Sequence, residues 1–200
     1  MKNKVGIVDY GLSGNVYNIQ KAIEKAGGIV YVIDNIEDFN KIDKIVIPGV
    51  GNFKDAIWEL KQKDLITPLI ENINTKPTLG ICLGMQLLST FGYESSKTDG
   101  LKIINAKVVP LNVDEVIPHV GFNKIDKIKD SKILNGLEDE EFYFMHSYEM
   151  LNFHDVAATT TYCEHQFVSA VEKGDVFGVQ FHPEKSREAG IKLFENFLNI

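Results

Sequence analysis

Cysteine is scarce in this sequence, long hydrophobic runs are missing, and acidic residues outnumber basic ones. The two cysteines, Cys82 and Cys163, lie far apart and have no metal-ligand spacing, so we expect free thiols in a reducing, cytoplasmic environment. No apolar stretch approaches the roughly 18 residues of a membrane-spanning helix, and the first residues lack the apolar segment of a signal peptide. The 21 basic and 28 acidic side chains give a net charge of −7, which argues against nucleic-acid and anionic-membrane partners.

The sequence does contain what a globular core requires. Its 200 residues are 44% hydrophobic and show no repeat, low-complexity tract or linker, so we expect one domain spanning residues 1–200. In the amino-terminal half, apolar runs at residues 5–9, 29–33 and 44–47 alternate with helical patterns that begin at Val16 and that cover residues 53–60 and 66–73. This alternation predicts an α/β fold with a mostly parallel sheet and helices on both faces.

The carboxyl-terminal half differs in pattern. Short β-rich segments separated by turns occupy residues 101–111, 120–128, 141–148, 156–161, 167–171 and 176–181. One helical pattern follows at residues 188–198, so we expect antiparallel β additions closed by a single helix. Because sites in parallel sheets gather at the carboxyl ends of strands, the loops at residues 9–14 and 48–51 and the turn after residue 81 are expected along one edge.

Residues 78–88 predict a nucleophile on a sharp turn. An apolar run ends at Cys82, and leucines at helical spacing begin directly afterwards. Gly80 and Gly84 flank the cysteine, as in Gly-x-Ser-x-Gly hydrolases, because such a turn leaves no room for neighbouring side chains. The start of the following helix favours a thiolate, and the N–H of Leu83 is placed to stabilise an oxyanion. A buried structural cysteine between two packing glycines explains this pattern about equally well.

A base and its orienter are predicted near the carboxyl terminus. His182 follows an apolar strand and precedes Pro183, which biases it toward extended geometry. If the chain stays extended, His182 and Glu184 point to the same side, and the carboxylate leaves one imidazole nitrogen free to take a proton from a thiol. A His two residues from a Glu is more often a solvated surface pair. Together with a glycine-flanked Cys82, however, the pair indicates covalent catalysis.

The remaining histidines suggest no metal site. His119 and His146 lie in motif-like segments with glycine, serine or aromatic neighbours, whereas His154 and His165 lie in polar, turn-like segments where exposure is the default. No histidine pair has a metal spacing and no Cys/His cluster occurs, so we predict no metal and no cofactor. The loop at residues 9–14 lacks both glycine-rich phosphate-binding patterns and is interpreted as an ordinary strand-to-helix turn.

Four motifs, in this order and spacing, resemble the class I (triad) glutamine amidotransferases. They are Pro48-Gly49-Val50-Gly51, Gly80-Ile81-Cys82-Leu83-Gly84-Met85-Gln86, Tyr143-Phe144-Met145-His146-Ser147-Tyr148 and Gly178-Val179-Gln180-Phe181-His182-Pro183-Glu184-Lys185-Ser186. The resemblance spans nearly the whole chain, and the Cys and His-Pro-Glu motifs together are highly specific for this class. The segment Pro118-His119-Val120-Gly121-Phe122-Asn123 and the opening Asp9-Tyr10-Gly11 further resemble the glutaminase subunits of imidazole glycerol phosphate synthase.

The resemblance implies a reaction and a role for each matching residue. Cys82 is expected to attack the side-chain amide of L-glutamine, His182 to move the proton and Glu184 to hold His182. Ammonia is expected to pass to a cyclase or synthase subunit in a heterodimer that serves histidine biosynthesis. The oxyanion site is expected at Val50, Gly51 and Leu83, the substrate contacts at Gln86, His146, Ser147 and Tyr148, and the partner face with the ammonia exit at Pro118, His119, Phe122 and Asn123.

The sequence departs from the family pattern at two places. The loop from Tyr10 to Asn15 is one residue longer than the usual Tyr-Gly-Met-Gly-Asn, and Phe122 stands where the family usually has tryptophan. Both departures lie near the expected partner face, so we also consider a paralogous subunit that supplies ammonia for surface-sugar biosynthesis. A stand-alone thiol hydrolase, such as a γ-glutamyl peptidase, and a catalytically inactive binding module are further hypotheses from different functional classes.

Overall fold

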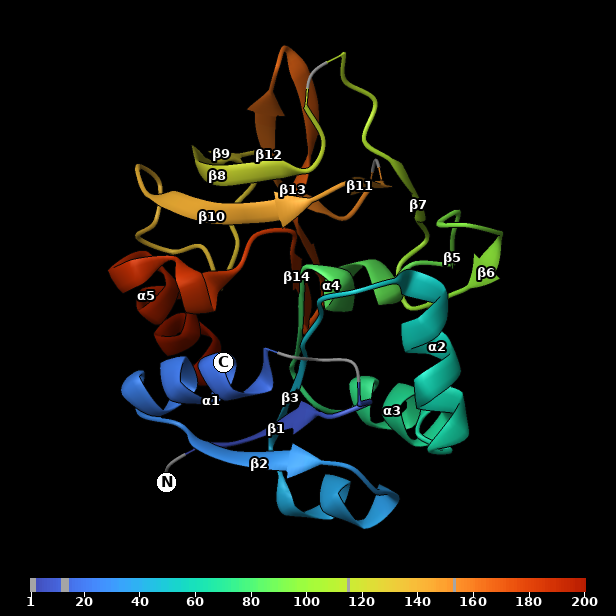
Figure 1. Cartoon of the computed structure of the whole chain (residues 1–200). Coiled ribbons are helices and arrows are strands. Elements are labelled where there is room, and N and C mark those ends of the chain that lie inside the picture. Colours follow the sequence, from blue (N-terminus) through green and yellow to red (C-terminus); the bar gives the residue numbers. More distant parts are fainter. Residues whose placement is uncertain (1–2, 12–14, 115, 153) are drawn as a thin grey trace.

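The computed structural model describes residues 3–11, 15–114, 116–152 and 154–200. Its main feature is an eight-stranded sheet with the order β2-β1-β3-β4-β14-β13-β12-β9 (Figure 1). The strands are β1 (Lys4–Val8), β2 (Ile29–Ile33), β3 (Lys44–Ile47), β4 (Thr78–Ile81), β9 (Asp126–Lys127), β12 (Val156–Tyr162), β13 (His165–Lys173) and β14 (Val176–Val179). The strands from β2 to β14 are parallel, and β13, β12 and β9 extend the sheet in antiparallel pairing.

Helices cover both faces of this sheet, as Figure 1 shows. On one face lie α1 (Val16–Lys25) and α5 (Arg187–Leu198), and on the other lie α2 (Phe53–Gln62) and α3 (Ile66–Ile73). Each face of the sheet has its own hydrophobic core, and strand β3 contributes to both. Val46 packs in the core with α1 and α5, whereas Ile45 and Ile47 pack in the core with α2 and α3. Successive side chains of a strand alternate between faces, so an uninterrupted apolar strand feeds both cores. The predicted α/β class is confirmed.

Smaller elements complete the carboxyl-terminal half. Strands β8 (His119–Lys124) and β10 (Glu141–His146) form an antiparallel pair, and β11 (Tyr148–Leu151), β7 (Lys107–Pro110), β5 (Phe91–Gly92) and β6 (Thr98–Asp99) form a second small sheet. The short helices are α4 (Leu83–Leu87) and the 3-10 helices η1 (Ile36–Lys41) and η2 (Pro183–Lys185). In the described ranges, no helix has the length and apolar character needed to cross a membrane.

The predicted elements match best in the amino-terminal half. The helix at residues 66–73 and the strand at residues 44–47 have the predicted bounds. In the segment 101–111, by contrast, only Lys107–Pro110 forms a strand. The N–H groups of the preceding residues donate instead to carbonyls of residues 87–89, beside α4. A tertiary contact therefore replaces the predicted local β pairing there.

Candidate active site

Cys82 lies on the sharp turn between β4 and α4, where a nucleophile was predicted. Its backbone has φ 51° and ψ −109°, a conformation that non-glycine residues rarely adopt and that costs on the order of 1–3 kcal/mol. A Cβ on Gly84 would lie 1.9 Å from the carbonyl oxygen of Ile47, and one on Gly80 would lie 2.7 Å from the Gly84 carbonyl. Both glycines are therefore required by the packing of this turn.

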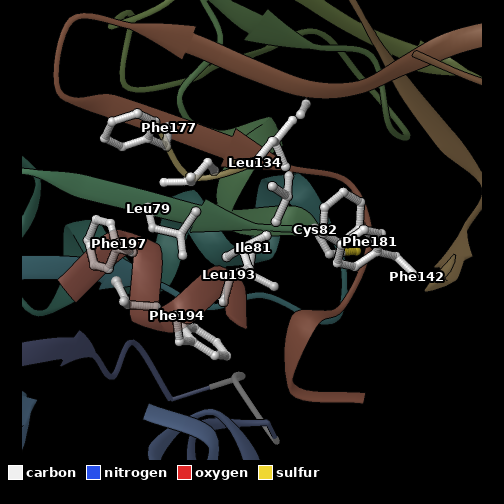
Figure 2. Close-up of a cluster of buried hydrophobic side chains, with 14 of the residues drawn as sticks. Leu79, Ile81, Cys82, Leu134, Phe142, Phe177, Phe181, Leu193, Phe194 and Phe197 are labelled. Carbon is white, nitrogen blue, oxygen red and sulfur yellow. The ribbon is translucent and has the colours of Figure 1, made fainter. Parts of the chain in front are cut away.

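The side chain of Cys82 belongs to one of the two hydrophobic cores. Figure 2 shows it beside Phe181 and near Phe142, at one end of the hydrophobic cluster that includes residues of β4 and α5. The rings of Phe142 and Phe181 stack with their centroids 4.1 Å apart. The cysteine is 7% exposed, whereas Cys163 is an exposed free thiol. Little of Cys82 is therefore accessible to a substrate.

His182 and Glu184 form a pair, but not through an extended chain. Residues Pro183–Lys185 form the 3-10 helix η2, which begins directly after His182. Proline suits the first position of such a helix because its φ is already helical and it has no N–H to satisfy. Within this turn Nδ1 of His182 donates to Oε1 of Glu184 at 2.8 Å, and both side chains are fully buried. The expected extended geometry is wrong, although the expected contact occurs.

The surroundings of His182 favour its protonated form. Burial lowers the pKa of His182, but the interactions with Cys82 and with the carboxylate of Glu184 outweigh burial and raise this pKa to about 10. Nε2 of His182 makes no hydrogen bond of ordinary geometry within the described ranges, yet the Cys82 sulfur is near enough for its charge to act on the ring. Asn15 donates from Nδ2 to Oε1 of Glu184 and so holds the carboxylate. One imidazole nitrogen is left to exchange a proton with Cys82.

A cavity of about 240 Å³ opens at Cys82. The predicted residues that line it are Val50, Gly51, Leu83, Gln86, Pro118, His146, Ser147 and Tyr148. Glu94 and Met145 line it as well, and neither was predicted from the sequence. Glu94 stands in a polar turn outside every motif, and Met145 belongs to the motif at residues 143–148 but was given no role. Only the approach of β10 and of the turn after β5 to the turn at Cys82 makes them part of the cavity.

Gln86 and Glu94 contribute acceptor atoms to this cavity. Nε2 of Gln86 donates to the carbonyl oxygen of Tyr148 at 3.2 Å and to Oε1 of Gln180 at 3.0 Å, which uses both amide hydrogens. Its Oε1 has no hydrogen bond in the part of the chain that the structure describes. Oε2 of Glu94 accepts from the N–H of Phe53 at 2.7 Å, at the start of α2. Both residues line the cavity, so it offers acceptors that suit a cationic group of a substrate.

His146 and His119 form a buried pair beside the cavity. Nδ1 of His146 lies 2.9 Å from the carbonyl oxygen of Tyr148, which can only accept, so Nδ1 carries the proton and Nε2 is an acceptor. Nδ1 of His119, 3.2 Å from that Nε2, must then be a donor. Burial lowers the pKa of His146 to about 4 and also lowers the pKa of His119. Both rings are consequently neutral at pH 7.

The turn predicted to supply an oxyanion N–H begins at Pro48, directly after β3. The hydroxyl of Tyr10 donates to the carbonyl oxygen of Pro48 at 2.6 Å. Burial, together with the charges of Cys82 and Asp9, raises the pKa of Tyr10, so its hydroxyl stays a donor. The first loop and this turn are therefore joined, as expected of two loops on one sheet edge. Residues 12–14 of the predicted loop lie outside the described ranges.

Comparison with known proteins places these residues in a sequence family. The family model described as "Glutamine amidotransferase class-I" matches residues 7–200. The chain belongs to the class I glutamine amidotransferases. This amidotransferase is 41% identical over 197 residues to the imidazole glycerol phosphate synthase subunit HisH of Aquifex aeolicus, covering 96% of this chain and 94% of that protein. It is 40% identical over 211 residues to the HisH subunit of Pelagibacter ubique, covering 98% and 99%.

Solved structures share the fold of this amidotransferase. PurLQS from Thermotoga maritima superposes with a TM-score of 0.76 at 17% identity, covering 100% of this chain and 99% of the other. A glutamine amidotransferase from Thermotoga maritima gives a TM-score of 0.62 at 19% identity, covering 100% and 85%. At these identities the likeness concerns the fold alone.

The residues predicted to face a partner of the amidotransferase lie on β8 and just before it. Pro118 lines the cavity, whereas the side chain of His119 is buried. The guanidinium of Arg187 lies 4.4 Å from the ring centroid of Phe122, and Asn123 donates to the carbonyl oxygen of Thr161 at 3.0 Å. The exposed apolar side chains here, called the β8 strip, are Val116, Ile117, Val120 and Phe122. The strip thus adjoins Pro118, at the edge of the cavity.

Proposed function

We propose that this amidotransferase hydrolyses L-glutamine to glutamate and ammonia through a thioester on Cys82. The observation that carries the proposal is the strained Cys82 at a cavity, together with a buried His182–Glu184 pair whose second imidazole nitrogen has no other hydrogen-bond partner in the described ranges. The relatives named HisH support a place in histidine biosynthesis as the glutaminase subunit of imidazole glycerol phosphate synthase. We further propose that all 200 residues form one domain, which acts in the cytoplasm without a cofactor.

In the proposed reaction, His182 takes the thiol proton of Cys82 through Nε2 while Glu184 holds the imidazolium through Nδ1. The thiolate attacks the side-chain amide carbon, and N–H groups of Leu83 and of the turn at Val50 stabilise the oxyanion. The imidazolium then protonates the leaving nitrogen, and ammonia departs. Water then attacks the thioester while His182 accepts a proton from the water, and a second oxyanion forms. Its collapse breaks the bond to Cys82 and releases glutamate and the Cys82 thiolate.

The cavity also indicates how the amino-acid end of glutamine is held. Oε1 of Gln86 and the carboxylate of Glu94 are acceptors, so they suit the α-ammonium group. A neutral His146, with its pKa lowered by burial to about 4, offers no positive charge to the α-carboxylate. That group instead binds the hydroxyl of Ser147 and the backbone near Tyr148, which line the cavity. His146 then acts by holding the Tyr148 carbonyl.

The partner of this reaction is proposed to be a cyclase or synthase subunit that forms a heterodimer with the chain and receives ammonia. The β8 strip is an exposed group of apolar side chains, and such groups on a soluble protein mark contact surfaces. Pro118 lines the cavity and follows Ile117 of the strip in sequence, so we propose that ammonia leaves there. A net charge of −7 disfavours nucleic acid or an anionic membrane as partner.

A comparison of Cys82→Ala with Cys163→Ala tests the reaction. Glutamate release is measured for each protein, alone and with the cyclase partner and its ligand. We expect Cys82→Ala to lose at least about 1,000-fold in rate because the nucleophile is gone. Cys163→Ala should keep its rate because this thiol is exposed on a turn after β12. Full partner-stimulated ammonia release by Cys82→Ala would refute the mechanism.

A second experiment distinguishes the possible partners. Purified chain is mixed with a histidine-pathway cyclase or with a sugar-modifying synthase, and stimulation of glutamine hydrolysis is measured. We expect stimulation by the cyclase. Stimulation by the sugar synthase alone would assign the chain to the surface-sugar pathway. High turnover of γ-glutamyl peptides by the isolated chain would favour a stand-alone thiol hydrolase.

A further inference from the structure

Gln180 lies between β14 and His182 and contacts the sulfur of Cys82. Its side chain is fully buried, and its Nε2 lies 3.5 Å from Sγ. Backbone hydrogen bonds hold both residues in place: the N–H of Cys82 donates to the carbonyl oxygen of Val179 at 2.7 Å, and the N–H of Gln180 donates to the carbonyl oxygen of Ser169 at 2.9 Å. The fold therefore holds the amide of Gln180 next to the sulfur of Cys82. The reaction proposed above gives this amide no role.

The orientation of the Gln180 amide follows from the carbonyl group of Tyr148, which contacts Gln86, and Gln86 in turn contacts Gln180. The oxygen of Tyr148 can only accept, so the atom of Gln86 that faces it, at 3.2 Å, must be the amide nitrogen. The second hydrogen of that nitrogen points to Gln180 at 3.0 Å, so the Gln180 atom at this contact must be the oxygen. The nitrogen of Gln180 then faces Cys82. The carbonyl of Tyr148 thus makes Gln180 a donor to the sulfur.

Two contacts of the sulfur favour opposite charge states. The carbonyl oxygen of Met145, 3.9 Å from Sγ, accepts a hydrogen bond from a thiol but repels a thiolate. The amide of Gln180 donates to the sulfur, and a donated hydrogen bond is stronger when the acceptor is charged. Gln180 therefore opposes the effect of Met145 and favours the thiolate, the form that attacks a carbonyl carbon.

We propose that Gln180 is a further catalytic residue, which holds the thiolate of Cys82, and that Gln86 is a positioning residue that orients it. Gln86 then has two roles, because its nitrogen orients Gln180 while its oxygen faces the cavity. The contribution of Gln180 to turnover rests on the glutaminase function proposed above. Its effect on the charge of the sulfur needs no substrate and can be measured without one.

The test compares Gln180→Met with Gln166→Met in a Cys163→Ala background, in which Cys82 is the one remaining thiol. Methionine has a similar length but no donor, and Gln166 is an exposed glutamine of β13. The rate of alkylation by iodoacetamide and the ultraviolet absorbance of the thiolate are followed against pH. We expect Gln180→Met to move the midpoint of both curves upward and to lower alkylation at neutral pH by about 10- to 100-fold. Gln166→Met should leave both curves unchanged.

Turnover provides a second measurement on the same proteins. With the partner present, kcat for glutamine should fall by a factor of about 10 to 100 in Gln180→Met while KM changes little, because the lost contact is to the sulfur and not to the substrate. An unchanged alkylation curve in folded Gln180→Met overturns the inference.

A variant of Gln86 keeps the test decisive if Gln180→Met fails to fold. Gln86→Met removes the hydrogen bond that orients the Gln180 amide, so it should move the alkylation midpoint in the same direction by a smaller factor. An unchanged midpoint in that variant overturns the inference. A shifted curve in a chain that never hydrolyses glutamine, even with a partner, would support the contact of Gln180 with the thiolate and refute the proposed function.

Discussion

Two buried histidines near the same cavity have pKa values that are shifted in opposite directions. His182 is 0% exposed and His146 is 5% exposed, yet the pKa of His182 is raised to about 10 and that of His146 is lowered to about 4. Burial lowers the pKa in both cases. The difference lies in the partners: Glu184 and Cys82 act on His182, whereas a carbonyl and His119 contact His146. Charged neighbours, more than the depth of burial, therefore decide which histidine can carry a positive charge.

The two histidine pairs therefore suit different tasks. The His182–Glu184 pair can accept and return a proton, because the ion pair that forms is stabilised at both ring nitrogens. The His119–His146 pair stays neutral and uses its ring protons to hold neighbouring atoms, including the carbonyl of Tyr148 at the cavity. One pair is proposed to take part in the chemistry, and the other to hold the walls of the site.

Removing the charge of Glu184 should have the largest effect on this contrast. In Glu184→Gln, the imidazolium of His182 loses its anionic partner, so we expect kcat to fall by about 100- to 10,000-fold and the pKa of His182 to drop. Glutamine hydrolysis with the partner present measures the rate, and nuclear magnetic resonance titration measures the pKa. Glu188→Gln is the control, since Glu188 is an exposed glutamate of α5 that pairs with Lys25. A wild-type kcat in Glu184→Gln would show that the buried pair is merely structural.

Breaking the neutral pair should affect stability. In His119→Phe the ring can still stack on Tyr162 and Phe144, but Nε2 of His146 loses its donor. A buried acceptor without a partner costs about 1–3 kcal/mol, so we expect the free energy of unfolding in urea to fall by that amount. His154→Phe, at an exposed position, is the control. An unchanged free energy of unfolding in His119→Phe would mean that the contact between the two rings contributes nothing.

Acid should destabilise the protein in part through His146. Its pKa is about 4 in the folded protein against an ordinary value of 6.5, so the unfolded chain takes up the proton first as the pH falls. The contribution of this group to stability is therefore present above about pH 6.5 and is lost as the pH falls through about 4. Urea unfolding of wild type and His146→Gln across that range measures it. We expect a shallower decline in the variant, and parallel declines would contradict the assignment.

Features of the site that depend on local contacts could be predicted from the sequence, whereas those that depend on distant contacts could not. The glycine-flanked turn of Cys82 and the element bounds at residues 44–47 and 66–73 were predicted correctly, because backbone sterics and side-chain periodicity act over a few residues. The contact between His182 and Glu184 was predicted from the wrong local geometry. A 3-10 turn beginning with Pro183 brings the two side chains together as well as an extended segment would.

Other features of the site had no local signal. Glu94 lines the cavity from a turn after β5, and Gln180, although it belongs to the motif at residues 178–186, was given no role. His119 was predicted at the partner face on the strength of the resemblance, and the structure places its side chain in the interior, against His146. Each of these positions is defined by residues that are distant in sequence, so periodicity and turn patterns carry no information about them.

The sequence by itself determined the alternation of strands and helices, the two-faced core and the sharp turn at Cys82, because these follow from sterics and from the spacing of apolar side chains. Only the tertiary structure decided the charge and direction of the polar groups. The raised pKa of His182, the neutral ring of His146 and the amide of Gln180 turned toward the sulfur all depend on partners from distant segments. A hydrogen bond or a charge acts over a few ångströms, and folding alone brings such groups that close.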